Sequence, residues 1–190
     1  MEALLNSTVK NPRGIPQAPF VEKVDDYVKK PEDFEKVMAM FQERLQQYKY
    51  MEQSKKNAAA GFKKKIPEID DSLKMVELVK KKKEAQESLE TNYELNETVY
   101  TTAEIEPTDT VLLWLGADVM LEYPLDEAIE LLTEKLATAK RNLQISEEDA
   151  EFLRENITTM EVNAARLYNW DVERRKNLRL AEEGVKNLRA

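Results

Sequence analysis

Two long runs of apolar residues at seven-residue spacing constrain the fold of this chain more than any other feature. Such heptads are typical of α-helices that pack against another helix in a coiled coil. Pro67 lies inside the first run and is expected to kink that helix, because proline removes a backbone hydrogen bond. In the first run, positions a are Met38, Leu45, Glu52, Ala59, Ile66 and Leu73, and positions d are Phe34, Phe41, Tyr48, Lys55, Phe62, Ile69 and Val76.

The second run starts after Pro124, where proline and acidic residues favour the first turn of a helix. Asp171 and Arg174 occupy core positions, and we expect them to be partly exposed and paired along the helix, or to mark where the helices separate. Neither apolar seam can stay solvated, so the helices should fold back as an antiparallel pair. In the second run, positions a are Ile129, Leu136, Leu143, Ala150, Ile157, Ala164, Asp171, Leu178 and Val185, and positions d are Leu125, Leu132, Ala139, Ser146, Leu153, Met160, Leu167, Arg174, Ala181 and Leu188.

The stretch between the two runs predicts two consecutive β-hairpins. Apolar and polar residues alternate from Tyr93 to Ile105, which indicates a pair of strands with one buried face and a turn near Asn96. The next strand, 111–115, is apolar on both faces, and Gly116 favours a turn before the strand 119–123. We expect that the chain cannot cover these strands itself, so that partner chains supply the missing layer and close the sheet edges.

The predicted fold class is therefore α+β, mostly α: a long antiparallel two-helix coiled coil with two β-hairpins inserted at its turn. The expected divisions are 1–31, an extended segment with a short helix at 20–28; 32–90, the first coiled-coil helix; 91–123, the hairpins; and 124–190, the second coiled-coil helix. Residues 1–19 contain three prolines and show no periodicity, so we expect them to be extended or disordered, or to lie on a partner.

Composition argues against several functions. The net charge of −8 disfavours binding to nucleic acid or to anionic membranes, and no segment is long and apolar enough to span a membrane. The chain has no Cys and no His, which removes the commonest nucleophile, general base and transition-metal ligands. We therefore expect no enzyme activity, no metal and no cofactor, and a cytoplasmic location, with a nuclear pool as a further option.

The second hairpin and the helix after it, TVLLWLGADVMLEYPLDEAIELL, resemble the α-type subunits of the prefoldin family. The segments NPRGIPQAPFVEKVDDYV, FQERLQQYKYMEQSK and LYNWDVERR extend this resemblance over nearly the whole chain. The resemblance implies a hexamer of two α-type and four β-type subunits, with a β-barrel platform and coiled-coil tentacles. It also implies that the tips hold unfolded actin and tubulin and pass them to the cytosolic chaperonin without ATP.

Two sets of site residues follow as expectations. The candidate subunit interface in the strands comprises Val99, Val111, Leu112, Leu113, Trp114, Leu115, Val119 and Leu121. The candidate client-binding tip comprises Phe34, Val37, Met38, Phe41, Leu45, Leu167, Tyr168 and Trp170. The tip residues also fit a plain core, which leaves both interpretations open. A coiled-coil tether or scaffold of another complex is the alternative function, although it does not explain the inserted hairpins.

Overall fold

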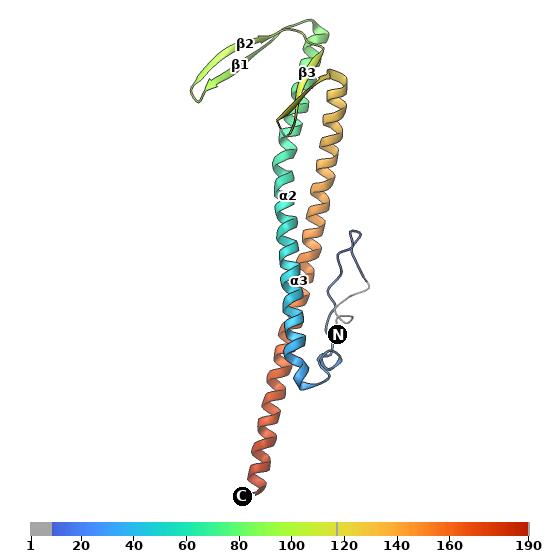
Figure 1. The fold of residues 1–190 in the computed structure, drawn as a ribbon, viewed down its shortest axis with the longest axis vertical. Helices are drawn as coiled ribbons and strands as arrows, with labels where there is room; N and C mark the ends of the chain where they lie inside the picture. The colour runs from blue at the N-terminus through green and yellow to red at the C-terminus, as the bar shows by residue number, and fades with distance from the viewer. Residues whose placement is uncertain (1–8, 117, 190) are drawn as a thin grey trace. The chain divides into compact units, whose positions relative to one another are not determined.

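The computed structural model describes residues 9–116 and 118–189, with side chains up to Glu182. It is mostly helical, with two hairpins between two long helices, which confirms the predicted fold class (Figure 1). The elements are η1 (Val24–Asp26), η2 (Pro31–Asp33), α2 (Phe34–Ala85), β1 (Leu89–Asn96), β2 (Val99–Ile105), β3 (Thr110–Gly116), β4 (Val119–Pro124) and α3 (Leu125–Arg189). The chain forms two compact units, which we call the first unit (1–57 with 146–190) and the second unit (58–145).

The helix ends follow from local chemistry. Pro31, Glu32 and Asp33 form a 3-10 turn directly before α2, as suits proline and acidic residues at the positive end of a helix. At the other end of α2, Gln86 adopts a left-handed conformation with φ of 55°. Its N–H donates to the Lys83 carbonyl at 3.0 Å, and the Glu87 N–H donates to the Lys82 carbonyl at 3.0 Å. These two bonds form a Schellman cap.

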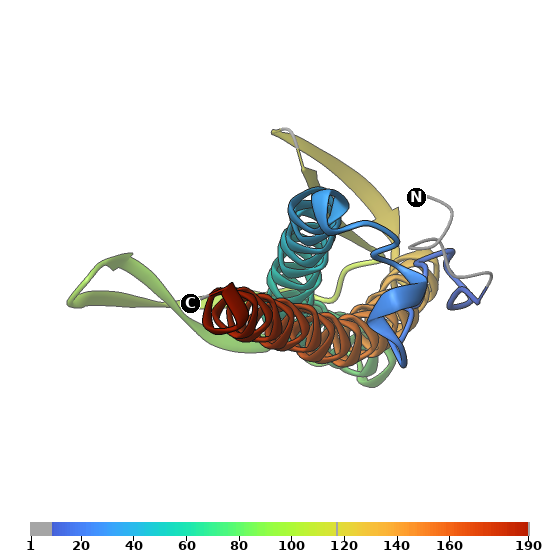
Figure 2. The same ribbon diagram turned by 90° about the horizontal axis from the view of Figure 1, so that it is seen from below.

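The two hairpins form separate two-stranded antiparallel sheets (Figure 2). In β1–β2, Leu89 pairs with Ile105 and the turn follows Asn96, as predicted. In β3–β4, Val111 pairs with Tyr123 and Trp114 with Met120. Gly116 has φ of 101°, which fits the predicted turn, whereas Ala117 lies outside the described residues.

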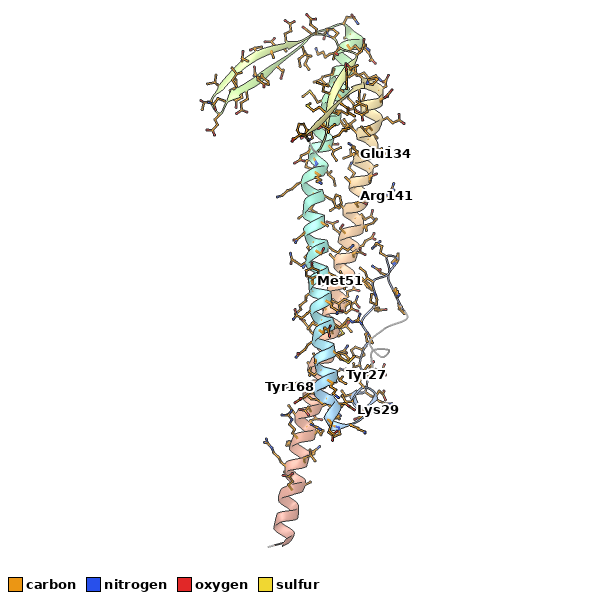
Figure 3. The ribbon with its side chains drawn as sticks, viewed as in Figure 1. Tyr27, Lys29, Met51, Glu134, Arg141 and Tyr168 are labelled. Atoms are coloured by element: carbon orange, nitrogen blue, oxygen red, sulfur yellow. The ribbon has the colours of Figure 1, made fainter. Side chains whose placement is uncertain are left out.

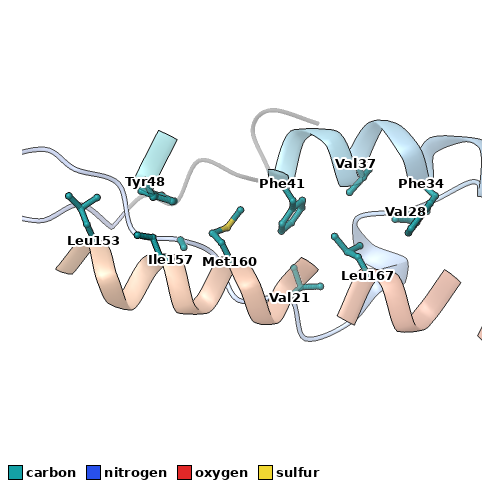
Figure 4. Packing of buried hydrophobic residues seen from close by; sticks show 11 residues of the cluster. Val21, Val28, Phe34, Val37, Phe41, Tyr48, Leu153, Ile157, Met160 and Leu167 are labelled. Atoms are coloured by element: carbon teal, nitrogen blue, oxygen red, sulfur yellow. The ribbon is translucent and has the colours of Figure 1, made fainter. Parts of the chain in front are cut away.

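The core of the first unit joins the start of α2 to α3 and to the N-terminal segment (Figure 4). The d residues of the heptads carry it: Phe34, Phe41 and Tyr48 from α2 and Leu153, Met160 and Leu167 from α3 are all buried. Early residues of α2 thus pack with late residues of α3, as an antiparallel pair requires. Because each buried apolar side chain contributes roughly 1.5–3 kcal/mol, this seam is the main source of stability in the first unit.

The core of the second unit joins the end of α2, the start of α3 and one hairpin. Val76 on α2 and Leu125, Ala128 and Leu132 on α3 are buried together. Val111, Leu113 and Tyr123 of β3–β4 pack against this cluster. The Leu125 N–H donates to the Asp109 carbonyl at 3.1 Å, which fixes the start of α3 to the loop before β3.

The N-terminal segment agrees with the expectation in part, because the described residues 9–19 form no helix or strand. Residues 9–28, which we call the strap, lie against the helices of their own first unit. Val21 and Val28 belong to the core of that unit. The only helical turn in the strap is η1, three residues long, where a short amphipathic helix was predicted over 20–28. The apolar side chains of Val21 and Val28 pack into the core of the first unit instead. The Val21 N–H donates to the side chain of Asn163, so it is not available for a helical hydrogen bond.

Candidate functional site

The predicted interface residues differ in how far the chain's own helices cover them. Val111 and Leu113 are half-buried against the core of the second unit. The expectation that the chain could cover neither face of β3 is thus wrong for one face, because α2 and α3 cover part of it. The other predicted interface residues are exposed in this chain: Val99, Leu112, Trp114, Leu115, Val119 and Leu121.

The uncovered face of β3–β4 is strongly apolar. Leu112 is 63% exposed and Trp114 59% exposed, and they lie two residues apart on the same face of β3. Met120 pairs with Trp114 and is also exposed, whereas Glu122 pairs with Leu112 and accepts a hydrogen bond from Thr110 Oγ1 at 2.6 Å. Contiguous exposed apolar surface of this kind marks an interaction site.

The β1–β2 hairpin is more exposed still. Tyr93, Leu95 and Val99 share one face, and Tyr100 lies on the other; each is at least half exposed. The predicted buried face of this hairpin is therefore uncovered in the single chain. A two-stranded sheet alone is marginally stable in water, so this hairpin also needs a partner.

The predicted tip residues also divide. Phe34, Val37, Phe41 and Leu167 are buried in the core of the first unit, and Met38, Leu45 and Trp170 are half-buried beside it. Tyr168, labelled in Figure 3, is 62% exposed. The aromatic members make defined contacts: Phe34 stacks on Trp170 at 6.5 Å between ring centroids, and Tyr27 of the strap meets Phe41 edge-on at 5.9 Å.

A set of polar side chains that sequence reasoning missed holds the strap. Asp149, Asn156 and Asn163 are buried polar residues at seven-residue spacing along α3, beside the apolar seam. Asn156 Oδ1 accepts from the Ala18 N–H at 2.5 Å, and Asn163 Oδ1 accepts from the Val21 N–H at 2.9 Å. Two asparagines one heptad apart inside a helix, where asparagine has low propensity, were the available signal.

Asp149 joins three segments of the first unit. Its Oδ1 accepts from Arg13 Nε of the strap at 2.5 Å, and its Oδ2 lies 2.9 Å from Lys55 Nζ on α2. Burial raises the pKa of this carboxyl, but the hydrogen bonds from Lys55 and Arg13 outweigh burial, so that the pKa lies below its ordinary value. Lys55 is a charged residue at a d position that is normally apolar, and its pairing with the buried Asp149 carboxylate explains why it stands there.

Ion pairing also explains the charged residues at two other core positions of the heptads, Asp171 and Arg174. Asp171 is buried, and its two oxygens each lie 2.6 Å from a guanidinium nitrogen, of Arg174 and of Arg175. The expected pairing of Asp171 with Arg174 along the helix is confirmed, but the expected partial exposure of Asp171 is wrong, because its side chain is buried. Beyond this cluster, Leu178 and Leu180 of α3 are exposed.

The described residues hold no cluster suited to metal chemistry. Among the side chains described, those of 9–116 and 118–182, no group of three or more acidic residues lies close enough to bind an ion. The helices of the same part of the chain include none that is long and apolar enough to cross a membrane. The notable surfaces are therefore apolar faces and the strap contacts.

Comparisons with known proteins agree on one family. A family model for prefoldin subunits matches residues 48–170. The chain is 53% identical over 198 residues to prefoldin subunit 3 of Saccharomyces cerevisiae, with 100% of each chain covered. It is 48% identical over 164 residues to prefoldin subunit 3 of Homo sapiens, covering 85% of this chain and 83% of that one. A chain of filamentous PFD from Methanocaldococcus jannaschii has a similar fold, with a TM-score of 0.50 at 14% identity, covering 64% of this chain and 98% of that chain.

Proposed function

This chain belongs to the prefoldin family of chaperone subunits, and on that premise we propose that it works in a hexamer of two α-type and four β-type subunits. In this proposal the hexamer captures unfolded actin and tubulin chains at coiled-coil tips in the cytoplasm. It then delivers them to the cytosolic chaperonin without ATP hydrolysis.

The observation that carries the assembly part of the proposal is the uncovered face of β3–β4. Leu112 and Trp114 expose most of their apolar surface to water in the single chain. Burial of such side chains is worth roughly 1.5–3 kcal/mol each, so partner strands that cover this face would stabilise an assembly strongly. The exposed β1–β2 hairpin supplies a second edge for pairing with a partner strand.

Client capture is supported by the apolar lining of the first unit. Met38, Met40 and Met51 are partly exposed beside the core, and methionine side chains adapt their shape at little cost. Surfaces of this composition suit partners of varied sequence. No phosphate-binding glycine loop occurs in the sequence, which fits a mechanism without nucleotide.

Co-expression with candidate α-type and β-type prefoldin subunits tests the assembly. We expect a hexamer by native mass spectrometry for the unaltered chain, and loss of the hexamer for Leu112→Asp with Trp114→Asp, because both charges would be buried at the interface. The matched control is Glu77→Lys, an exposed position on α2 that should assemble normally. A chain that assembles equally well with the double substitution refutes this interface.

Aggregation of denatured actin, measured by light scattering with and without ATP, tests the activity. The hexamer should suppress scattering to the same extent in both conditions. A complex that forms only dimers and suppresses nothing would instead favour a coiled-coil tether.

A further inference from the structure

Between Pro16 and Val21 the strap is held through its backbone, whereas its polar side-chain contacts, from Asn11, Arg13 and Asp25, lie outside this stretch. Besides the two amides bound by asparagines, the Pro19 carbonyl accepts from Asn163 Nδ2 at 2.7 Å. The Val21 carbonyl accepts from Arg166 Nη1 at 3.0 Å. The Pro16 carbonyl accepts from Tyr48 Oη at 3.0 Å. Between Pro16 and Val21, side chains of α2 and α3 thus form hydrogen bonds with the main chain of an extended segment.

The side chains that the strap inserts are small and apolar. Ala18 and Val21, three residues apart, are buried against the helices, and Val28 is buried further along. The receiving surface includes Phe41 and Met160 (Figure 4), which are fully buried by the strap and the helices together. Shape demands are modest at such a surface, because methionine repacks readily.

Recognition of a main chain does not depend on sequence, since every residue except proline offers the same N–H and C=O groups. A groove that binds backbone amides and carbonyls and accepts small apolar side chains therefore suits many extended segments. These are the properties of an unfolded polypeptide, in which backbone groups are free and apolar side chains are exposed.

The middle of the strap has little structure of its own to hold it in place. The strap's internal backbone hydrogen bonds lie within 9–17, around the bridge of Lys10 with Pro16, and within 23–28 at η1. Two polar contacts hold the strap towards its ends. Arg13 pairs with Glu148 and Asp149 of α3, and Asp25 accepts a hydrogen bond from Trp170 Nε1 of α3 at 3.2 Å. Arg13 and Trp170 are both partly exposed. Segments with few internal contacts open at lower free-energy cost than the helical core.

We propose that the groove under residues 16–21, formed by Tyr48, Asn156, Met160, Asn163 and Arg166, is a binding site for extended unfolded polypeptide. The strap occupies this groove as an internal stand-in, and a client segment displaces it. This inference rests on the proposed function and names the site and the mode of binding within this chain.

Photo-crosslinking from position 48 tests the displacement in the assembled complex. With benzoylphenylalanine in place of Tyr48, irradiation should give a strap crosslink near Pro16 without client, and a crosslink to client after addition of actin diluted from denaturant. The matched control is the same photoreactive residue in place of Tyr50, which lies two residues along α2 and is 80% exposed. Its crosslinking to client should be weaker than that of position 48.

A disulfide lock supplies the second measurement. The chain has no cysteine, so Ala18→Cys with Asn156→Cys introduces one defined pair where backbone and side chain already meet. When about nine tenths of the strap is locked, the client crosslink at position 48 should fall on the order of tenfold, because only open grooves bind. The reference is the same variant with its disulfide reduced, so that the loss of Asn156 is common to both measurements, and reduction should raise the crosslink again by about the same factor.

The outcomes separate the two proposals. Client crosslinks at position 48 that vanish on locking and return on reduction support the groove. If the complex suppresses aggregation normally but locking leaves the client crosslink unchanged, or position 48 yields only the strap product, the groove is refuted and the proposed function stands. If the unaltered complex captures no client at all, both are refuted.

Discussion

Replacement of Asn163 by alanine should release the strap while leaving the helices intact. The Asn163 side chain is fully buried and makes two hydrogen bonds to strap backbone, from the Val21 N–H at 2.9 Å and to the Pro19 carbonyl at 2.7 Å. Losing both costs about 2–3 kcal/mol, at roughly 1–1.5 kcal/mol each. Alanine returns about 0.5 kcal/mol through its higher helix propensity. The expected net loss of strap docking is therefore about 2 kcal/mol.

Native-state hydrogen exchange of the Ala18 amide measures this loss. That amide is bonded to Asn156, not to Asn163, so it reports on the strap as a unit. A change of about 2 kcal/mol corresponds to roughly thirtyfold faster exchange. The matched control is Thr158→Ala, since the Thr158 hydroxyl bonds only the Arg154 carbonyl of its own helix, at 3.0 Å. If the Val21 amide alone exchanges faster and Ala18 keeps its protection, the strap does not dock cooperatively and the reasoning is wrong.

Three further predictions concern stability. Phe41→Ala should lower the free energy of unfolding by about 3–5 kcal/mol in urea titrations, because the ring is buried, whereas Tyr50→Ala should change it by less than about 0.5 kcal/mol. Gln86→Gly should raise the stability by about 1 kcal/mol and the Tm by about 2–4 °C, because glycine removes the strain of a positive φ; Gln86→Ala should give no gain. The pKa of Asp149 is lowered in the folded state, so its contribution is present above about pH 4 and is lost as the pH falls through the folded pKa. Asp149→Asn should therefore abolish that part of the acid-induced loss in strap protection, and an unchanged acid profile would contradict the assignment.

The helices and hairpins could be predicted because their signals are local. Phe41, Tyr48, Leu153 and Met160 follow the heptad pattern, and each is buried as that pattern requires. The turn at Gly116 followed equally from the conformational freedom of glycine.

The strap could not be predicted because its partners lie far away in sequence. Ala18 and Val21 bond to side chains more than 130 residues later, and no periodicity connects them. The apolar residues from Phe20 to Val28 fit helical spacing, but bonds to Asn163 and Arg166 engage the backbone of Val21 instead. Tertiary contacts thus decide the conformation of a segment whose local preference is weak.

The sequence pattern of β3 could not show which segments cover each of its faces. A strand with apolar residues on both faces predicts cover on both sides but does not identify the source of that cover. Val111 and Leu113 pack on the chain's own helices, whereas Leu112 and Trp114 stay open for a partner.

The carboxylate of Asp149 has a consequence for how the chain reaches its final alignment. If α2 slid by one heptad in the first unit, Asp149 would meet the ring of Tyr48 in place of Lys55, and a buried charge that loses its partner costs about 3–5 kcal/mol. The pair of Asp149 and Lys55 therefore favours one alignment of the two helices over one shifted by a heptad. Tyr48 of α2 and Asn163 of α3 both bind the backbone of the strap, so the strap can dock fully only after the two helices are aligned. In refolding experiments followed by pulsed hydrogen exchange, the Ala18 amide should accordingly gain protection later than the amides of α3, and simultaneous protection would exclude this order.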